Sequence, residues 1–267
     1  MQDLLGFYAS IGVFTAIAQL AYLFVAFVVG GTLFVRGRRS GEWTQWLLGL
    51  HLILSMGVGY LLTCAGTVAV EYHAPVTPTQ VGWILAFGYG ASSAGLTTTL
   101  HFTRRVFRSG KGLPFAYSFA SGAAIWTGWL GYVVSGDVTH GRFEGMWYWV
   151  MTMGMLACNV WVAFEPCAYY TRLRKRVRLG LAEPLVAERM LLWGIGSLAR
   201  ASLVCAGPLA NAYMAGEDEA THRAVGAAVL VTTSFLGLVI SGSYWLALQP
   251  PRAYLRWVER RAARLRA

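Results

Sequence analysis

The stretch VLVTTSFLGLVISGSYWLAL, residues 229–248, carries no charged side chain and is mostly apolar. About 20 such residues let a helix cross the ~30 Å hydrocarbon core of a bilayer. Similar apolar blocks occupy most of the 267 residues of the chain. They lie near residues 13–35, 45–67, 80–103, 114–135, 146–170, 190–213 and 224–248. The sequence therefore predicts an all-α polytopic membrane protein, a bundle of seven transmembrane helices.

Composition supports the same class. Hydrophobic residues make up 56% of the chain and charged residues 13%, which is typical of membrane proteins and leaves no room for a soluble catalytic domain. We expect one transmembrane domain over residues 1–249 and a basic amphipathic helix over residues 250–267. The formal charge of +10 would suggest a nucleic acid partner in a soluble protein, but its distribution along the chain argues against one.

The basic residues are sorted by loop. Alternate loops on one side hold only Arg142 and Arg223. Because positively charged loops stay in the cytoplasm, this asymmetry predicts an external N-terminus and a cytoplasmic C-terminus. Nineteen of the 22 basic residues lie in the predicted cytoplasmic loops and tail: Arg36, Arg38, Arg39, Arg104, Arg105, Arg108, Lys111, Arg172, Arg174, Lys175, Arg176, Arg178, Arg189, Arg252, Arg256, Arg260, Arg261, Arg264 and Arg266.

Two cytoplasmic features follow from local signals. The fifth predicted helix should run past the membrane surface and stop at Gly180, and Glu183 with Pro184 should open the next helix. In the tail, apolar residues recur at helical spacing among six arginines. We expect this tail helix to lie on anionic lipid headgroups, with binding to a cytoplasmic protein as the alternative.

One basic residue, Arg200, lies inside a predicted span, about eleven residues or ~16 Å from its cytoplasmic edge. A charge at that depth costs at least ~2.5–3.5 kcal/mol on insertion scales, so Arg200 should face the bundle interior and have a partner. Glu165 is the only acidic residue in the predicted spans, and Asn159 lies near the depth of Arg200. We expect an Arg200–Glu165 pair between neighbouring helices, either structural or part of a ligand site or switch.

Two histidines complete the predicted intramembrane polar cluster: His51 in LLGLHLILS and His101 in TTTLHFTRR. A haem held by two histidines needs imidazoles that face each other at similar depth, whereas these differ by about a helical turn. We therefore favour hydrogen-bonded histidines over a haem site.

Each predicted external loop has one histidine close to acidic residues, a set that would suit a divalent metal ion or a pH-responsive cluster. The spacing matches no fixed metal motif, so ordinary solvated loop residues are the alternative. The residues concerned are Glu71 and His73, then Asp137, His140 and Glu144, then Glu219 and His222.

Seven spans with an external N-terminus resemble microbial rhodopsins and seven-helix receptors in architecture. A retinal Schiff base would need a lysine in the seventh helix, yet the two lysines of the chain, Lys111 and Lys175, lie in loops. Covalent retinal is therefore excluded. The intramembrane histidine pattern of the ceramidase and progestin-receptor-like superfamily is also absent, which argues against membrane hydrolysis of that kind.

Three segments carry a closer resemblance: TRRVFR (residues 103–108), RVRLGLAEPLVAERMLLWG (residues 176–194) and LALQPPRAYLRWV (residues 246–258). Together they are similar to seven-helix membrane proteins of bacteria and to the membrane sensor modules joined to bacterial signalling enzymes. The resemblance implies a compartment, the bacterial inner (plasma) membrane, and a multi-pass topology. The chain has no kinase region after its last helix, so we expect no enzymatic activity of its own.

The leading hypothesis is a non-enzymatic sensor that passes a stimulus to a cytoplasmic partner through its fifth and sixth helices. A small-molecule or ion transporter is the first alternative, with the serines and threonines of GYGASSAGLTTTLH lining a pathway. A haem- or metal-binding membrane enzyme is the second.

Overall fold

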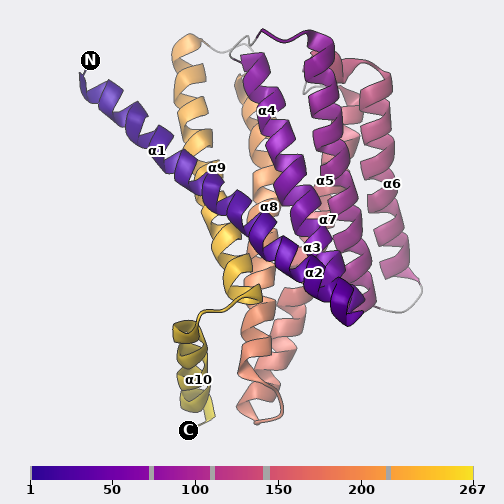
Figure 1. Ribbon diagram of the computed structural model, residues 1–267, viewed down its shortest axis with the longest axis vertical. Coiled ribbons are helices and arrows are strands. Elements are labelled where there is room, and N and C mark those ends of the chain that lie inside the picture. The colour runs from indigo at the N-terminus through magenta and orange to yellow at the C-terminus, as the bar shows by residue number, and fades with distance from the viewer. Residues whose placement is uncertain (1, 72–74, 109–111, 141–144, 215–217, 267) are drawn as a thin grey trace.

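The computed structural model describes residues 2–71, 75–108, 112–140, 145–214 and 218–266. Every regular element in these ranges is a helix, as the sequence predicts, and the helices form an elongated bundle (Figure 1). Five of them are long and apolar enough to span a membrane: Ser10–Ser40, Trp43–Ala69, Met146–Arg178, Pro184–Ala210 and Ala224–Leu248. The chain is therefore a membrane protein by the length and composition of its helices.

The first two candidate spans each contain a stretch of π-helix. These stretches contact each other inside the bundle. A π-turn interrupts the regular α-helical hydrogen bonding and is frequent at functional sites. The first span consists of α1 (Gln2–Phe24), η1 (Val25–Val29) and α2 (Gly30–Ser40), and the second of α3 (Trp43–His51), η2 (Leu52–Gly59) and α4 (Tyr60–Glu71).

The remaining elements are α5 (Pro78–Phe107), α6 (Leu113–Val134), the short 3-10 helix η3 (Asp137–His140), α7 (Met146–Arg178), α8 (Pro184–Met214), α9 (Glu219–Leu248) and α10 (Arg252–Arg266). Thr77 and Gln80 cap the start of α5 reciprocally, at 3.3 and 2.9 Å. Helices α5 and α6 are richer in Gly, Ser, Thr, Trp and Tyr than the five apolar spans. They pack against each other and against α7 within the bundle.

The outer surface of the bundle is apolar. Side chains at helical spacing on α1, such as Val13, Ile17 and Leu20, are more than half exposed, and Phe235 on α9 is equally exposed. A soluble protein rarely exposes so large an apolar area, whereas a lipid-facing helix does so as a rule. The interior is filled by fully buried residues including Met56, Leu96, Ile125, Met151 and Ile240.

Helices α7 and α8 form a hairpin that projects below the ends of α5 and α6 (Figure 1). Helix α7 ends at Arg178, Gly180 adopts a positive φ of 71°, and α8 begins at Pro184, so the predicted stop and start are confirmed. The Leu181 amide donates to the Arg176 carbonyl at 2.8 Å and closes the turn.

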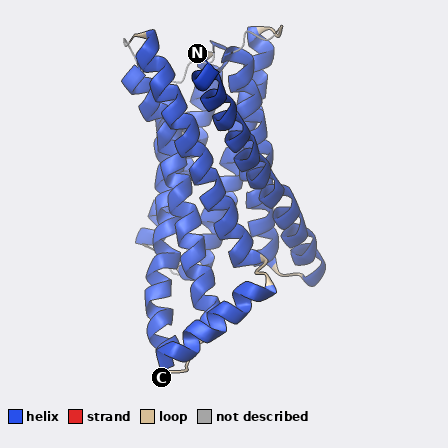
Figure 2. Ribbon diagram, turned by 90° about the vertical axis from the view of Figure 1, so that its left-hand side faces the viewer, coloured by secondary structure: helices blue, strands red, loops and turns tan. Residues whose placement is uncertain are grey.

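The tail helix α10 packs on this hairpin and runs obliquely across the lower end of the molecule (Figure 2). Its Val258 and Ala262 are 2% and 5% exposed, and Ala262 belongs to a small apolar cluster with Leu173, Val177 and Ala187. Protein therefore covers these two positions, and the contact of this helix with anionic lipid headgroups stays a prediction. Its Arg256 and Arg260 remain exposed.

Candidate functional site

The site that we describe first is the Arg200 centre: Arg200 on α8, His51 at the end of α3, and Ser55 in η2. All three side chains are buried, with 6%, 3% and 3% of their surface exposed. Arg200 Nη1 donates to His51 Nε2 at 3.0 Å, and Nη2 donates to Ser55 Oγ. The arginine thus reaches from α8 to the second span, across the bundle.

His51 is held in one tautomer by its other contact. Its Nδ1 lies 2.9 Å from the carbonyl oxygen of Gly95 on α5, and a carbonyl can only accept. Nδ1 therefore carries the proton, and Nε2 offers its lone pair to Arg200. The imidazole is neutral in this arrangement and adds no second positive charge beside the guanidinium.

Gly95 is required by the close approach of α5 to η2. A Cβ atom at position 95 would lie 2.5 Å from Ser55 Cβ and 2.7 Å from Ser55 N. The absence of a side chain lets the Gly95 carbonyl reach His51 and lets the π-segment present Ser55 to Arg200.

The predicted Arg200–Glu165 pair is wrong, because the structure gives both residues other partners. Arg108 Nε donates to the two carboxylate oxygens of Glu165 at 3.0 and 3.2 Å, and Trp161 Nε1 donates to Oε1 at 3.1 Å. Glu165 is 4% exposed, whereas the Arg108 side chain is 45% exposed. The ion pair therefore lies at the lower end of the bundle, between α5 and α7.

The register of α7 against α8 explains this difference. A Cβ atom at Gly194 would lie 2.2 Å from Cys167 Sγ and 3.3 Å from the Ala163 carbonyl, so Gly194 is level with Glu165. Arg200 is six residues further along α8, or ~9 Å higher at 1.5 Å per residue. Neighbouring helices in sequence do pack together here, but their side chains meet at other depths.

The other predicted cluster members are separate from Arg200. Asn159 is buried and its Nδ2 donates to the Met155 carbonyl of its own helix at 2.8 Å. His101 is half-buried on α5, six residues below Gly95 and near Arg104 and Arg105. Both ring nitrogens of His51 are engaged, so His51 has no nitrogen for a haem iron, and the bis-histidine haem site does not fit these residues.

Above the Arg200 centre lies the upper cavity, of about 350 Å³, between α1, α4, α8 and α9. Its lining includes Leu203 of α8, which is one helical turn from Arg200. Its wall is mostly apolar but includes seven side chains that carry a hydroxyl or amide group: Thr15, Gln19, Tyr22, Tyr60, Thr67, Thr233 and Ser234. An apolar cavity with a few polar groups that leads towards a buried cation is suited to a small ligand with a polar group.

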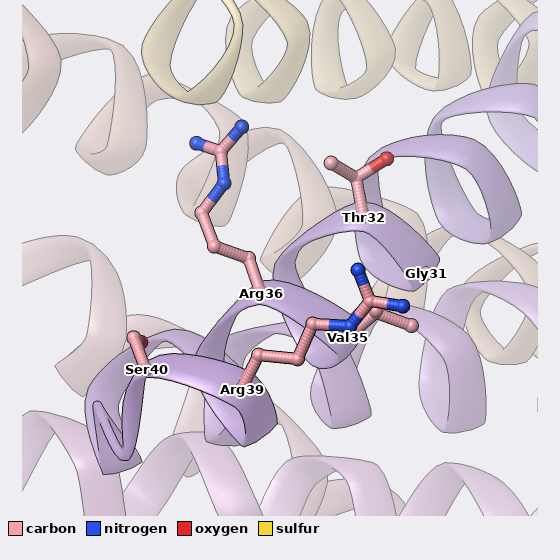
Figure 3. Close-up of a pocket in the computed structure, with 6 residues that line it drawn as sticks. All are labelled: Gly31, Thr32, Val35, Arg36, Arg39 and Ser40. Carbon is pink, nitrogen blue, oxygen red and sulfur yellow. The ribbon is translucent and has the colours of Figure 1, made fainter.

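A larger hollow of about 750 Å³ lies beside α2, but all its lining residues belong to that one helix. Figure 3 shows Thr32, Val35, Arg39 and Ser40 along its surface and the Arg36 side chain extending away from Arg39. This α2 hollow is an open surface feature, in contrast to the upper cavity, which four helices enclose.

The predicted external metal or pH site falls mostly outside the described residues. His73 and Glu144 are not described, and the side chains of Glu71, His140 and Glu219 are not described either. Among the described residues, no group of three His, Cys, Asp or Glu side chains is placed to hold a metal ion.

The two remaining members have local roles. Asp137 accepts a hydrogen bond from Ser135 Oγ at 2.9 Å. His222 is exposed on the first turn of α9, where Asp218 is the N-cap residue and accepts from the Thr221 amide at 2.8 Å. Hydrogen bonds from the side chain and backbone of Thr221 lower the pKa of Asp218.

Sequence reasoning missed Ser55, Gly95 and Arg108 as partners. A serine four residues after His51 would share its face on a helix, and this spacing is the one sequence signal from which Ser55 could have been found.

No protein-family model, curated protein sequence or solved structure matches the chain.

Proposed function

We propose that this chain is a seven-helix sensor of the bacterial inner membrane that binds a small anion at Arg200 and signals to a cytoplasmic partner. The observation that carries the proposal is the Arg200 centre. A guanidinium keeps its charge in proteins, and here the described residues offer it a neutral imidazole and a hydroxyl instead of a carboxylate. A buried charge without a counter-ion favours an incoming anion.

The seven-span topology rests on α5 and α6, which complete the bundle beside the five apolar spans. With the basic loops in the cytoplasm, the lower end of Figure 1 faces the cell interior and the N-terminus lies outside. The upper cavity then opens towards the external half of the membrane, so the anion reaches Arg200 from outside.

Helix α8 is the proposed transmission element. It carries Arg200 in its middle and Glu188 near its lower end, where Glu188 accepts from Arg261 Nη1 of α10 at 3.0 Å. A shift of α8 caused by an anion at Arg200 moves the hairpin and α10 together. The cytoplasmic partner would bind this lower end, and the exposed arginines of α10 would contact anionic lipid headgroups.

A carrier is the second candidate, because a second cavity lies on the opposite side of the Arg200 centre. This lower cavity, of about 280 Å³, includes Trp193 of α8, whereas the upper cavity includes Leu203. The same helix thus borders cavities both above and below Arg200, an arrangement that alternating access would use.

The test uses purified protein in phosphatidylcholine nanodiscs, titrated with chloride, acetate or inorganic phosphate against a bulky sulfonate as the balancing anion. A bound anion raises the thermal unfolding midpoint. We expect at least one anion to stabilise the wild type and Arg178→Gln, an exposed control, but not Arg200→Gln. If every anion raised the unfolding midpoint of Arg200→Gln as much as that of the wild type, the proposal would be wrong.

Two further measurements separate the sensor from the carrier. Anion flux into liposomes that stops in Arg200→Gln supports the carrier. Absence of flux, together with anion-dependent hydrogen exchange at the lower end of α8 (residues 184–190), supports the sensor.

A further inference from the structure

The lower cavity is enclosed by α2, α3, α5, α8 and α9 at the basic end of the bundle. No residue of the Arg200 centre lines it, so ligand binding in the lower cavity does not depend on anion binding at Arg200. Its lining combines an apolar wall with a few polar side chains: Leu33, Arg36, Gln45, Leu48, Phe102, Val106, Phe107, Arg189, Met190, Trp193, Ala247 and Leu248.

Three polar atoms of this lining are buried without a hydrogen-bond partner in the described structure: Gln45 Oε1, Arg189 Nε and Trp193 Nε1. Trp193 is 7% exposed, and its ring stacks on Phe102 at 5.5 Å between centroids, so its position is determined by packing. Leaving a buried donor or acceptor unpaired costs ~1–3 kcal/mol. Three such atoms around one cavity indicate that a bound molecule satisfies them.

The charge of the lining indicates what kind of molecule binds in the lower cavity. Arg36 and Arg189 are its charged members, and none of the described lining residues is acidic. The Arg36 guanidinium extends away from Arg39, which is the other arginine of the α2 hollow (Figure 3). Guanidinium groups match the planar or tetrahedral oxygens of carboxylates and phosphates, and an indole N–H adds a donor of the same polarity.

We propose that the lower cavity binds an amphiphilic oxyanion, with its carboxylate or phosphate head against Arg36, Arg189 and Trp193 Nε1. A hydroxyl or N–H group of the ligand donates to Gln45 Oε1. The apolar body of the ligand packs on Leu33, Phe102 and the other aliphatic and aromatic residues of the wall. The same head chemistry occurs in membrane lipids and in soluble metabolites, and the experiment distinguishes these two sources.

The probe is hexyl phosphate, titrated by calorimetry into the full chain in phosphatidylcholine nanodiscs. Arg189→Gln removes one charged contact of the head, and Trp193→Phe removes the indole N–H but keeps a stacking ring. Each should weaken binding about tenfold, as expected for the loss of one charge-assisted or buried hydrogen bond. Arg38→Gln, exposed on the same helix as Arg36 and outside the cavity lining, is the matched control and should bind as wild type does.

Nanodiscs that contain phosphatidylglycerol identify the source. Competition that abolishes hexyl phosphate binding supports a lipid headgroup, and unchanged binding supports a soluble ligand. Absence of hexyl phosphate binding in phosphatidylcholine, or equal affinities of Arg189→Gln, Trp193→Phe and Arg38→Gln, overturns the proposal. Arg200→Gln changes no residue that lines the lower cavity. Hexyl phosphate binding and the anion response at Arg200 are therefore separate measurements, and either proposal can fail without the other.

Discussion

Arg108 and Arg200 show two ways in which one protein accommodates arginine at its helices. Arg108 lies at the end of α5 with its side chain 45% exposed and pairs with the buried carboxylate of Glu165. Arg200 lies deep in α8 and is bonded to neutral groups. The first arrangement balances a buried negative charge from the surface, whereas the second leaves a positive charge within the bundle, which is why we assign ligand binding to the second.

This difference predicts an asymmetric response at the ion pair. Arg108→Gln leaves the Glu165 carboxylate, 4% exposed, with the Trp161 indole as its remaining described partner, and should lower the free energy of unfolding by about 1–2 kcal/mol. Glu165→Gln keeps an oxygen that accepts from Trp161, and it should lower the free energy of unfolding by less than Arg108→Gln does. Chemical unfolding in detergent measures both variants, with Arg178→Gln at an exposed position as control. Equal losses in the two variants would contradict the prediction.

At the scale of elements, the π-segment η2 and the glycine face of α5 build the Arg200 centre together. His51 ends α3 and Ser55 lies four residues later in η2, so both side chains face Arg200, while Gly95 lies against Ser55. Local sequence gives no warning of such a segment, because its residues, LILSMGVG, would also suit an ordinary apolar helix.

Gly95→Ala should separate α5 from η2, because the added Cβ would lie 2.5 Å from Ser55 Cβ and against backbone atoms. We expect the unfolding midpoint to fall, by an amount equivalent to ~1–3 kcal/mol, and the anion response at Arg200 to weaken. Gly122→Ala is the matched control, because nothing lies within 4 Å of a Cβ there and alanine favours helix. The idea fails if the two variants behave alike in thermal unfolding.

The start of α9 should depend on pH through Asp218. Its pKa is lowered in the folded chain by hydrogen bonds from Thr221, so its capping contribution is present above the unfolded value of 3.8 and is lost as pH falls through the folded value. The hydrogen-exchange protection of the first-turn amides of α9, corrected for the intrinsic pH dependence of the exchange rate, should therefore fall in acid. Asp218→Asn keeps a capping oxygen without a titrating group, and its exchange should lack this acid-dependent step.

At the scale of the whole molecule, α8 joins regions with different tasks. From its start in the hairpin that holds α10, it borders the lower cavity, carries Arg200 and then borders the upper cavity. The Trp193 ring contacts Tyr244 at 5.7 Å, and Tyr244 hydroxyl lies 3.2 Å from Ser197 Oγ, so α9 supports the same segment of α8. A displacement at either cavity would therefore reach the α10 contact through one continuous helix.

Docking of α10 can be tested by placing a charge in its buried face. Ala262→Arg, at a position 5% exposed, should detach α10 from Leu173 and Val177 and speed tryptic cleavage within residues 252–261. Ala263→Arg adds the same charge at the exposed neighbouring position and serves as the control. Limited proteolysis in nanodiscs measures both, and equal cleavage rates would argue against a docked α10.

The sequence by itself determined the helical class, the membrane-spanning character of five of its apolar blocks, and the boundaries at Gly180 and Pro184. These properties depend on local composition, on the length of apolar runs and on the backbone preferences of single residues, all of which are readable along the chain. It also singled out Arg200 and His51, because a polar residue inside an apolar run is conspicuous without any knowledge of contacts.

Only the tertiary structure decided which partners these residues have. The pairing of Arg200 with His51 and Ser55, and of Glu165 with Arg108, depends on the depth and rotation of each helix against its neighbours. Those quantities follow from close contacts such as Gly95 against Ser55 and Gly194 against Cys167, and from the π-segments that shift register. Depth counted along separate helices does not contain them, because an offset of a few residues moves a side chain by ~5–10 Å and turns it towards another helix.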